Sequence, residues 1–313
     1  MSALLISDLL SLRLSGGVNG FIPIDPMKNI LIGILFAILW SSAAVATKFG
    51  VLSVPPLVLA NARFFIAGFL LLLYAAIWGK NFRSPTYDEF KHLAVFGFFN
   101  TTLYLGLYVY AMKYTSAGIG ALAVSTNPLI IILLSSWLMG RRATMKEWIS
   151  ILIGIAGVGV ATLPLLDNAQ TTIGGLVLLS FSMVAVSYAS VYYAKVPWRL
   201  SNVLINGWQV TLGGILLLPF TYFMSDSSEI VLDTRFLYSV LWLSIAVSVV
   251  GLICWFHLLK IDAVKASLWL FLCPVFGFVY AWWLMDEPIT VNSYVGTAMV
   301  IAGLYLCLKK DKI

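Results

Sequence analysis

Residues 30–46 read ILIGILFAILWSSAAVA, a stretch without a single charged side chain. A helix that crosses a membrane needs about 20 predominantly apolar residues, so this stretch supplies most of one. Residues 149–163 are equally apolar and uncharged. Both stretches are continuously apolar, whereas the strands of a membrane barrel alternate apolar and polar residues. They therefore predict α-helices that cross a lipid bilayer.

The composition extends this prediction to the whole chain. Hydrophobic residues make up 61% of the 313 positions and charged residues 10%. Soluble domains contain about 45–50% apolar residues, even with glycine counted, and about 25% charged residues. The net charge of +6 does not indicate nucleic-acid binding, because the basic residues lie in loops, where membrane topology places them. We expect an all-α integral membrane protein that contacts the lipid bilayer and binds no nucleic acid.

Glycine, proline and polar clusters divide the chain into ten apolar segments. Residues 1–27 are expected to be a flexible N-terminal extension, because Asp8 and Arg13 interrupt a stretch too short to span; Met27 is the alternative start. The ten expected spans are residues 29–49, 56–78, 91–111, 115–139, 147–164, 172–194, 202–223, 235–258, 264–285 and 291–308.

The distribution of basic residues predicts the orientation. With the N-terminus inside, 15 of the 19 lysines and arginines fall on the inner side, as the positive-inside rule requires. Both termini are therefore expected in the cytoplasm, with the protein in the inner (plasma) membrane. A miscount of one span would scramble this sorting, so the sorting itself favours ten spans.

An internal repeat relates the two halves at an offset of 146 residues. Pro128 corresponds to Pro274, and Gly157 to Gly303; the sequence Trp-Leu-Met recurs at 137–139 and 283–285. Because each half contains five spans, the second half enters the membrane from the opposite side. This predicts two inverted five-helix repeats, residues 28–166 and 170–309, a design common among secondary transporters.

Several short motifs recur in a defined order along nearly the whole chain. They are Leu39-Trp40-Ser41, Ala62-Arg63-Phe64-Phe65-Ile66-Ala67-Gly68, Asn127-Pro128 and Met285-Asp286-Glu287-Pro288-Ile289-Thr290. Together they resemble the drug/metabolite transporter superfamily, specifically ten-helix exporters with two EamA-type repeats. One departure concerns the Gly-Glu-x-x-Thr sequence that the family has after the fourth helix, since Arg141 follows Gly140 here. Only Glu287, in the second half, keeps the acidic residue.

The resemblance implies a secondary transporter that exports or exchanges small organic metabolites, amino acids among them, by alternating access. One alternative is an intramembrane enzyme or lipid-handling carrier, which should show a cluster of ionisable residues facing one leaflet. Another is a channel or sensor, which should lack a closable, two-sided cavity. The sequence contains no P-loop, nucleophile elbow or histidine metal cluster. We expect no enzymatic activity, no cofactor and no metal; a homo-oligomer is left open.

Polar side chains inside the spans are the first candidates for the solute path, because they are costly in lipid and face interior cavities. Asn100, Tyr104 and Tyr108 follow at i, i+4 and i+8, which predicts one helix face. The alternative is that such residues only bond neighbouring helices. The remaining candidates are Trp40, Ser41, Asn127, Tyr188, Gln209 and Trp269.

Arg63 stands about 10 Å into the second span, at 1.5 Å per residue. A charged side chain at the membrane centre costs at least about 2.5 kcal/mol unless it is paired or reaches the headgroups. Arg63 therefore either snorkels, bonds to backbone carbonyls, or is a cavity cation that attracts the carboxylate of a solute. No Asp or Glu falls in the middle of any span, so proton coupling through a midmembrane carboxylate is unsupported. Uniport, exchange or a relay through another group stays open.

Pro128 and Pro274 occupy matching positions within their spans. A proline removes a helix hydrogen bond and kinks or breaks the helix. In a transporter such a break near the midplane exposes backbone groups that a polar solute can use. We expect both prolines to gate or shape the cavity, the alternative being a static kink needed for packing.

Overall fold

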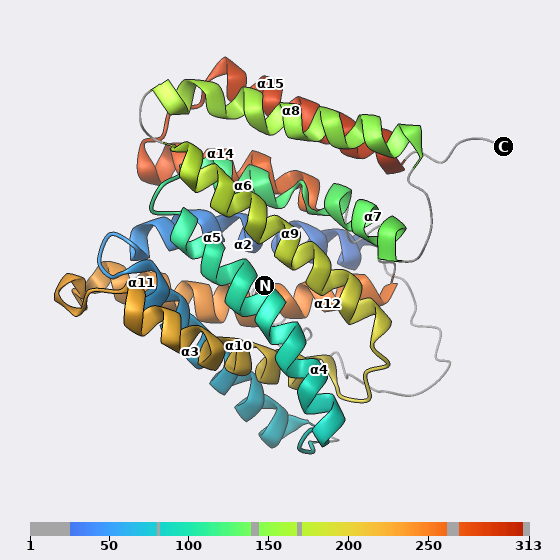
Figure 1. Cartoon of the computed structure of the whole chain (residues 1–313), viewed down its shortest axis with the longest axis vertical. Coiled ribbons are helices and arrows are strands. Elements are labelled where there is room, and N and C mark those ends of the chain that lie inside the picture. Colours follow the sequence, from blue (N-terminus) through green and yellow to red (C-terminus); the bar gives the residue numbers. More distant parts are fainter. Residues whose placement is uncertain (1–25, 80–81, 139–143, 168–170, 262–268, 309–313) are drawn as a thin grey trace.

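The computed structural model describes residues 26–79, 82–138, 144–167, 171–261 and 269–308 (Figure 1). The extension predicted at the N-terminus lies outside these ranges except for its last two residues. The first half contains α2 (Pro26–Gly50), α3 (Pro56–Trp78), α4 (Tyr87–Gly97), the π-helix η1 (Phe98–Leu103), α5 (Tyr104–Ala111), α6 (Ala117–Val124), α7 (Asn127–Leu138) and α8 (Met145–Asp167).

The second half has the same order of elements. It contains α9 (Ile173–Lys195), α10 (Asn202–Met224), the 3₁₀ turn η2 (Ser227–Glu229), α11 (Thr234–Leu241), the π-helix η3 (Trp242–Gly251), α12 (Leu252–Ile261), the 3₁₀ turn η4 (Trp269–Leu272), α14 (Cys273–Met285) and α15 (Val291–Leu308).

The all-helical membrane fold is confirmed for the part of the chain that the structure describes. Six of its helices are long and apolar enough to cross a membrane, and three shorter apolar helices accompany them. The bounds of α3 and α15 coincide with the predicted spans. The third span begins earlier than predicted, at Tyr87, because the capping box of Thr86 and Glu89 starts the helix in the polar segment.

The last helices of the two halves show the inversion directly. α8 and α15 lie side by side along one edge of the molecule (Figure 1). A Cβ atom added to Gly157 would lie 2.7 Å from the carbonyl oxygen of Gly296, and one added to Gly303 would lie 2.7 Å from that of Ser150. The residue numbers of the two contacts, 157 with 296 and 150 with 303, both add to 453. The number therefore falls along one helix as it rises along the other, so the helices are antiparallel. Equivalent helices of the two repeats therefore run in opposite directions.

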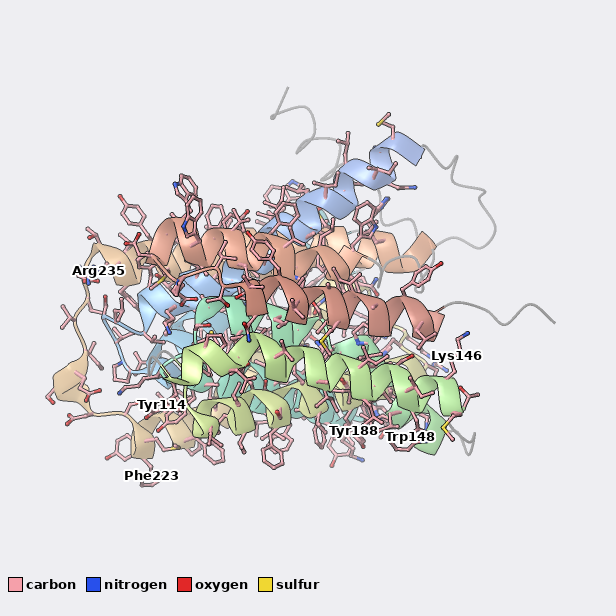
Figure 2. The ribbon with its side chains drawn as sticks, turned by 90° about the horizontal axis from the view of Figure 1, so that it is seen from above. Tyr114, Lys146, Trp148, Tyr188, Phe223 and Arg235 are labelled. Carbon is pink, nitrogen blue, oxygen red and sulfur yellow. The ribbon has the colours of Figure 1, made fainter. Side chains whose placement is uncertain are left out.

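The two ends of the bundle carry different residues. Figure 2 shows Arg235, Tyr114 and Phe223 at one end of the helices and Lys146 and Trp148 at the other. The charge pattern predicts that the Arg235 end faces outward and the Lys146 end faces the cytoplasm. The core of buried residues runs between them and is shared by helices of both halves. A candidate site can therefore draw side chains from either repeat.

The fourth and ninth spans are broken at their prolines. α6 ends at Val124 and α7 starts at Asn127, with Pro128 as its second residue. In the second half, η4 precedes α14, in which Pro274 is the second residue. The missing N–H of a proline costs nothing in the first turn of a helix, so each proline starts a new helix. The predicted kink or break is thus a break in both halves, whereas the gating role stays a prediction.

Candidate functional site

Arg63 is buried in the interior of the bundle. Its side chain is 4% exposed, so the guanidinium does not snorkel to the headgroups. Its Nε donates a hydrogen bond to the Ser248 hydroxyl oxygen at 3.0 Å, and the Ser244 hydroxyl donates to the Arg63 carbonyl at 3.3 Å. Both serines lie on η3, whose wide π-turn belongs to the second half of the chain. The second repeat therefore holds the arginine of the first.

Two buried tyrosines of α5 share this region. The ring centroids of Tyr104 and Tyr108 are 6.2 Å apart, and both residues interact electrostatically with Arg63. Cys273, at the start of α14, interacts with the same tyrosines and with the Ser41 hydroxyl of α2. We call Ser41, Arg63, Tyr104, Tyr108, Ser248 and Cys273 the central cluster.

The central cluster combines four predicted candidates with two residues that sequence reasoning missed. Neither Cys273 nor Ser248 is among the candidates predicted from the sequence. Cys273 had a detectable signal, because it precedes Pro274 as Asn127 precedes Pro128. Ser248 had none, since a lone serine in a span most often bonds within the bundle.

Asn100 and Gln209 meet in a second polar group. The Asn100 amide donates to Gln209 Oε1 at 3.4 Å, and the Thr101 hydroxyl donates to the same oxygen at 2.7 Å. Gln209 Nε2 in turn donates to the side-chain oxygen Oδ1 of Asn206 at 3.4 Å. Asn100 therefore bonds to α10, whereas Tyr104 and Tyr108 interact electrostatically with Arg63. The spacing i, i+4 no longer marks one face here, because Asn100 lies in η1, which makes i→i+5 bonds.

The aromatic candidates lie along different helices. The Trp40 ring packs 5.5 Å from Phe36 on α2. Trp269 packs so tightly on the same helix that a Cβ on Gly33 would lie 2.0 Å from its Cε2 atom. The ring of Tyr188 is 4.4 Å from that of Phe99. Trp40 is thus part of α2, and Trp269 packs against this helix, while Tyr188 packs against η1.

The two broken helices touch each other at their breaks. The Ser125 hydroxyl donates to the Leu270 carbonyl at 3.0 Å, joining the end of α6 to η4. Asn127 is 7% exposed, and its side-chain carbonyl oxygen has no hydrogen-bond partner among the described residues. Both prolines are buried beside these contacts. The breaks therefore leave polar atoms inside the bundle, where a solute could use them.

Glu287 forms a contact between the halves at the predicted outer end. Its carboxylate accepts hydrogen bonds from the Ala117 and Gly118 N–H groups, at 2.8 and 3.2 Å. These groups belong to the first turn of α6, where an anion is favoured by unpaired N–H groups and the helix dipole. Lys48 donates to the Thr115 carbonyl and lies 3.9 Å from Glu287. Lys48 thus binds protein groups at this end of the bundle.

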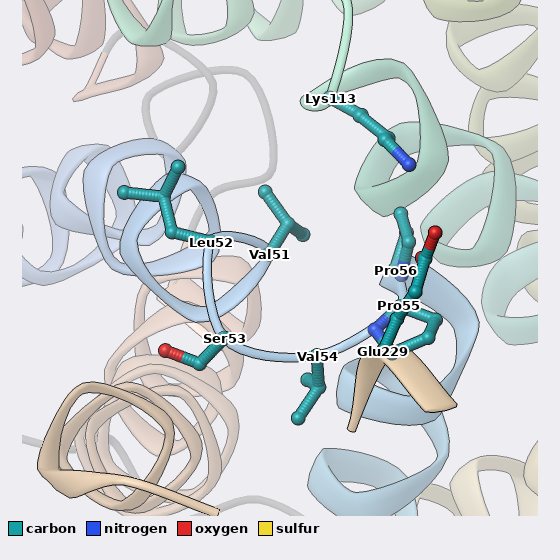
Figure 3. A pocket seen from close by; sticks show the side chains of 8 residues that line it. All are labelled: Val51, Leu52, Ser53, Val54, Pro55, Pro56, Lys113 and Glu229. Carbon is teal, nitrogen blue, oxygen red and sulfur yellow. The ribbon is translucent and has the colours of Figure 1, made fainter. Parts of the chain in front are cut away.

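A pocket of about 260 Å³ opens near this end of the bundle. It is lined by the turn between α2 and α3 and by Lys113 and Glu229, which extend toward it in Figure 3. None of the predicted site residues lines it. Within the described residues no group of three or more His, Cys, Asp or Glu could hold a metal ion. The candidate site is therefore the central cluster with its neighbouring polar groups.

Comparisons with known proteins concern the family and the fold of the chain. The model of the EamA-like transporter family matches residues 27–163 and 173–309. An uncharacterized transporter of Archaeoglobus fulgidus is 27% identical, over 91% of this chain and all of its own. A WAT1-related chloroplastic protein of Arabidopsis thaliana is 26% identical, over 94% of this chain and 71% of its own. A protein of known crystal structure is 20% identical, with a TM-score of 0.60 over 90% of this chain and 96% of its own, which shows the fold alone.

Proposed function

The protein belongs to the EamA-like transporter family, and on this premise we propose that it exports small amphipathic metabolites such as amino acids by alternating access. Membrane transport of small solutes follows from the family. The class of solute and the direction are the proposal. The observation that carries it is the central cluster, which is polar, buried and built by helices of both halves.

The arrangement of the breaks supports alternating access. Discontinuous helices at the contact between inverted repeats are typical of solute sites in secondary transporters. Here the Ser125–Leu270 hydrogen bond joins the two breaks, and Cys273 joins the second break to the tyrosines. Rocking of one half against the other would move these groups relative to one another. A solute held there would then be reached from either side in turn.

The contacts of Glu287 support a gate at the outer end. They connect the segment after α14 to the start of α6, and through Lys48 to the end of α2. An opening toward the outside has to separate these elements. Export would require this separation in each cycle, with the carboxylate and the α6 N–H groups hydrated in the open state.

Amphipathic solutes suit the mixture of side chains in the region. Hydroxyl and amide groups of Ser41, Asn100 and Asn127 offer polar partners, while Trp40, Tyr104 and Tyr108 offer aromatic surfaces. Aromatic rings stack on aromatic and cationic groups at centroid distances of about 4.5–7 Å. Aromatic amino acids combine all these features, so they are the first solutes to test.

Counterflow in proteoliposomes tests the function. Vesicles containing the purified chain and an unlabelled amino acid should accumulate the labelled amino acid transiently, and empty vesicles should not. Absence of counterflow with all twenty amino acids and a broad metabolite panel would contradict the proposal. Direction is tested in cells, where loss of the protein should raise the internal concentration of the transported solute.

The orientation is part of the proposal and has its own test. We place both termini in the cytoplasm, in the inner membrane. Single cysteines at positions 141 and 309, in a variant lacking the native cysteines, should react with a membrane-impermeant reagent only after the cells are opened. Labelling of the two positions from opposite sides would overturn the topology.

A further inference from the structure

The guanidinium of Arg63 has more donors than partners. Arginine carries five N–H bonds in a planar fork, and the Nε hydrogen is directed to Ser248. Among the described residues, the hydrogen bond of the guanidinium is that of Nε, and the two terminal nitrogens are not among the fully enclosed polar atoms that lack a partner. Their four N–H bonds are therefore available to a further acceptor that reaches them, and a nearly buried guanidinium favours such an acceptor.

Its positive charge is also uncompensated. The ion pairs in the described part of the chain are Lys48–Glu287, Arg83–Glu89 and Lys91–Asp88, and none of them involves Arg63. The described groups that interact with the guanidinium are the Ser248 hydroxyl and the side chains of Tyr104 and Tyr108, and a hydroxyl is neutral in its ordinary state. A buried cation that lacks a counter-ion is strongly disfavoured. Either the protein bears this cost permanently, or an anion enters.

A second, independent feature makes the region electropositive. α14 is a helix of 13 residues that begins at Cys273, and Cys273 interacts electrostatically with the two tyrosines that also interact with Arg63. The N-terminus of a helix carries about half a positive charge. Broken membrane helices use such N-termini to hold anionic groups of solutes. Arg63 and the start of α14 therefore favour the same sign of ligand.

We propose that the transported solute carries a carboxylate and that Arg63, in the central cluster, binds it. The planar fork matches the two oxygens of a carboxylate, so two parallel hydrogen bonds can form. Ser248 holds Nε and thereby orients the fork, and the rings of Tyr104 and Tyr108 flank the organic part of the solute. This inference rests on the proposed function, since transport supplies the solute.

Ligand-dependent unfolding of the full chain in detergent tests the inference without transport. The probes are phenylacetate and its neutral isostere phenylacetamide, at equal ionic strength. Binding to the native state alone raises the unfolding midpoint by mass action. We expect phenylacetate at about five times its Kd to raise the midpoint by about 1–2 °C, and phenylacetamide to leave it unchanged.

The variants assign the effect to one residue. Arg63→Gln removes the charge and should abolish the phenylacetate shift, while Arg63→Lys keeps the charge without the fork and should weaken binding about tenfold. Ser248→Ala leaves the guanidinium present and covers the case in which Arg63→Gln does not fold; we expect weakening of about three- to tenfold. Lys113→Gln, an exposed cation at the outer pocket, is the matched control and should retain the full shift.

Three outcomes overturn the inference. The first is no shift with phenylacetate, and the second is an equal shift with phenylacetamide. The third is an Arg63-dependent shift with chloride as large as that with phenylacetate, because a free inorganic anion would then be the occupant. Counterflow separates this inference from the proposed function. If phenylalanine and its amide exchange equally well, the proposed transport stands and the role of Arg63 is wrong. If neither exchanges but phenylacetate still shifts the unfolding midpoint, Arg63 binds a carboxylate and the proposed transport is wrong.

Discussion

The two broken helices share a backbone device but differ in their chemistry. The first break has the sequence Ser125-Thr126-Asn127-Pro128, and the equivalent positions of the second are Phe271-Leu272-Cys273-Pro274. Both place proline in the first turn of a helix. The first contributes a hydroxyl donor to Leu270 and the unpartnered oxygen of Asn127, whereas the second contributes a thiol beside the tyrosines. The repeat thus conserves the shape of the bundle and leaves the site asymmetric.

The ends of the two halves differ in the same way. Glu287 reaches across to the start of α6, while the equivalent position in the first half is Arg141, which lies outside the described residues. An arginine cannot accept hydrogen bonds from helix N–H groups. One half therefore supplies an anionic contact that the other cannot supply by the same chemistry.

The largest loss of stability is expected in the packing of α8 on α15, where the two halves are most alike. Gly157→Val and Gly303→Val each place side-chain atoms against a carbonyl oxygen 2.7 Å from the Cβ position, so each should destabilise by about 2–3 kcal/mol. Gly159→Val is the matched control, since a Cβ there meets nothing within 4 Å. Chemical unfolding in detergent measures the difference. Equal loss at all three positions would contradict the antiparallel packing of α8 on α15.

A smaller loss of stability is expected from the contact of Glu287 with α6, which only the second half makes. Glu287→Ala leaves the Ala117 and Gly118 N–H groups without their acceptor, which should cost about 1–3 kcal/mol. Lys48→Gln removes a long ion pair of 3.9 Å, and its side-chain amide can still donate to the Thr115 carbonyl, so it should cost less than Glu287→Ala. Unfolding midpoints of the two variants give the comparison. If Lys48→Gln is the more damaging change, the cap of α6 is not the main role of Glu287.

The difference between the breaks can be tested by transport. Asn127→Ala removes a buried oxygen that has no hydrogen-bond partner among the described residues, so it should not lower stability. If that oxygen binds solute, transport should fall about tenfold. Cys273→Ala should reduce transport less, since a thiol is a weak hydrogen-bonding group. Initial rates of counterflow at equal protein density decide the order. Equal rates for wild type and Asn127→Ala would remove Asn127 from the site.

The other path candidates have a corresponding test. Trp40→Ala and Asn100→Ala should each lower transport several-fold if these side chains line the path, with stability losses no larger than those of packing changes elsewhere. The rates are measured at normal expression, with Tyr222→Ala, an exposed aromatic on α10, as the control. Unchanged transport in both variants would refute the site assignment and leave the function untouched.

The smallest change in the free energy of unfolding is expected at the C-terminus of α14. Asp286 has φ of 53°, in the left-handed region that glycine adopts without strain, and the equivalent residue of the first half is Gly140. Asp286→Gly should therefore be neutral or stabilise by up to about 1 kcal/mol. The measurement is again the free energy of unfolding, with Asp286→Ala as the destabilising counterpart. A clear loss with glycine would mean that the Asp286 side chain makes a contact of its own.

Sequence reasoning located the spans within a few residues in most cases, because the cost of polar groups in lipid acts on each local segment. It also located the two breaks, since proline acts through its own backbone. It did not foresee the split of Asn100 from Tyr104 and Tyr108, because nothing local distinguishes the π-helix η1 from an α-helix. The roles of the predicted site residues stay predictions.

The amino-acid sequence alone determined that the chain is a helical membrane protein of two inverted halves. Hydropathy, positive charges in loops and a repeat of 146 residues are properties of the chain itself. Only the tertiary structure decided which side chains meet, such as Arg63 with Ser248 and Glu287 with the start of α6, residues 185 and 170 positions apart. The physical reason is that the transfer of an apolar segment into lipid depends on that segment alone. The partner of a buried charge, in contrast, is set by how distant helices pack around it.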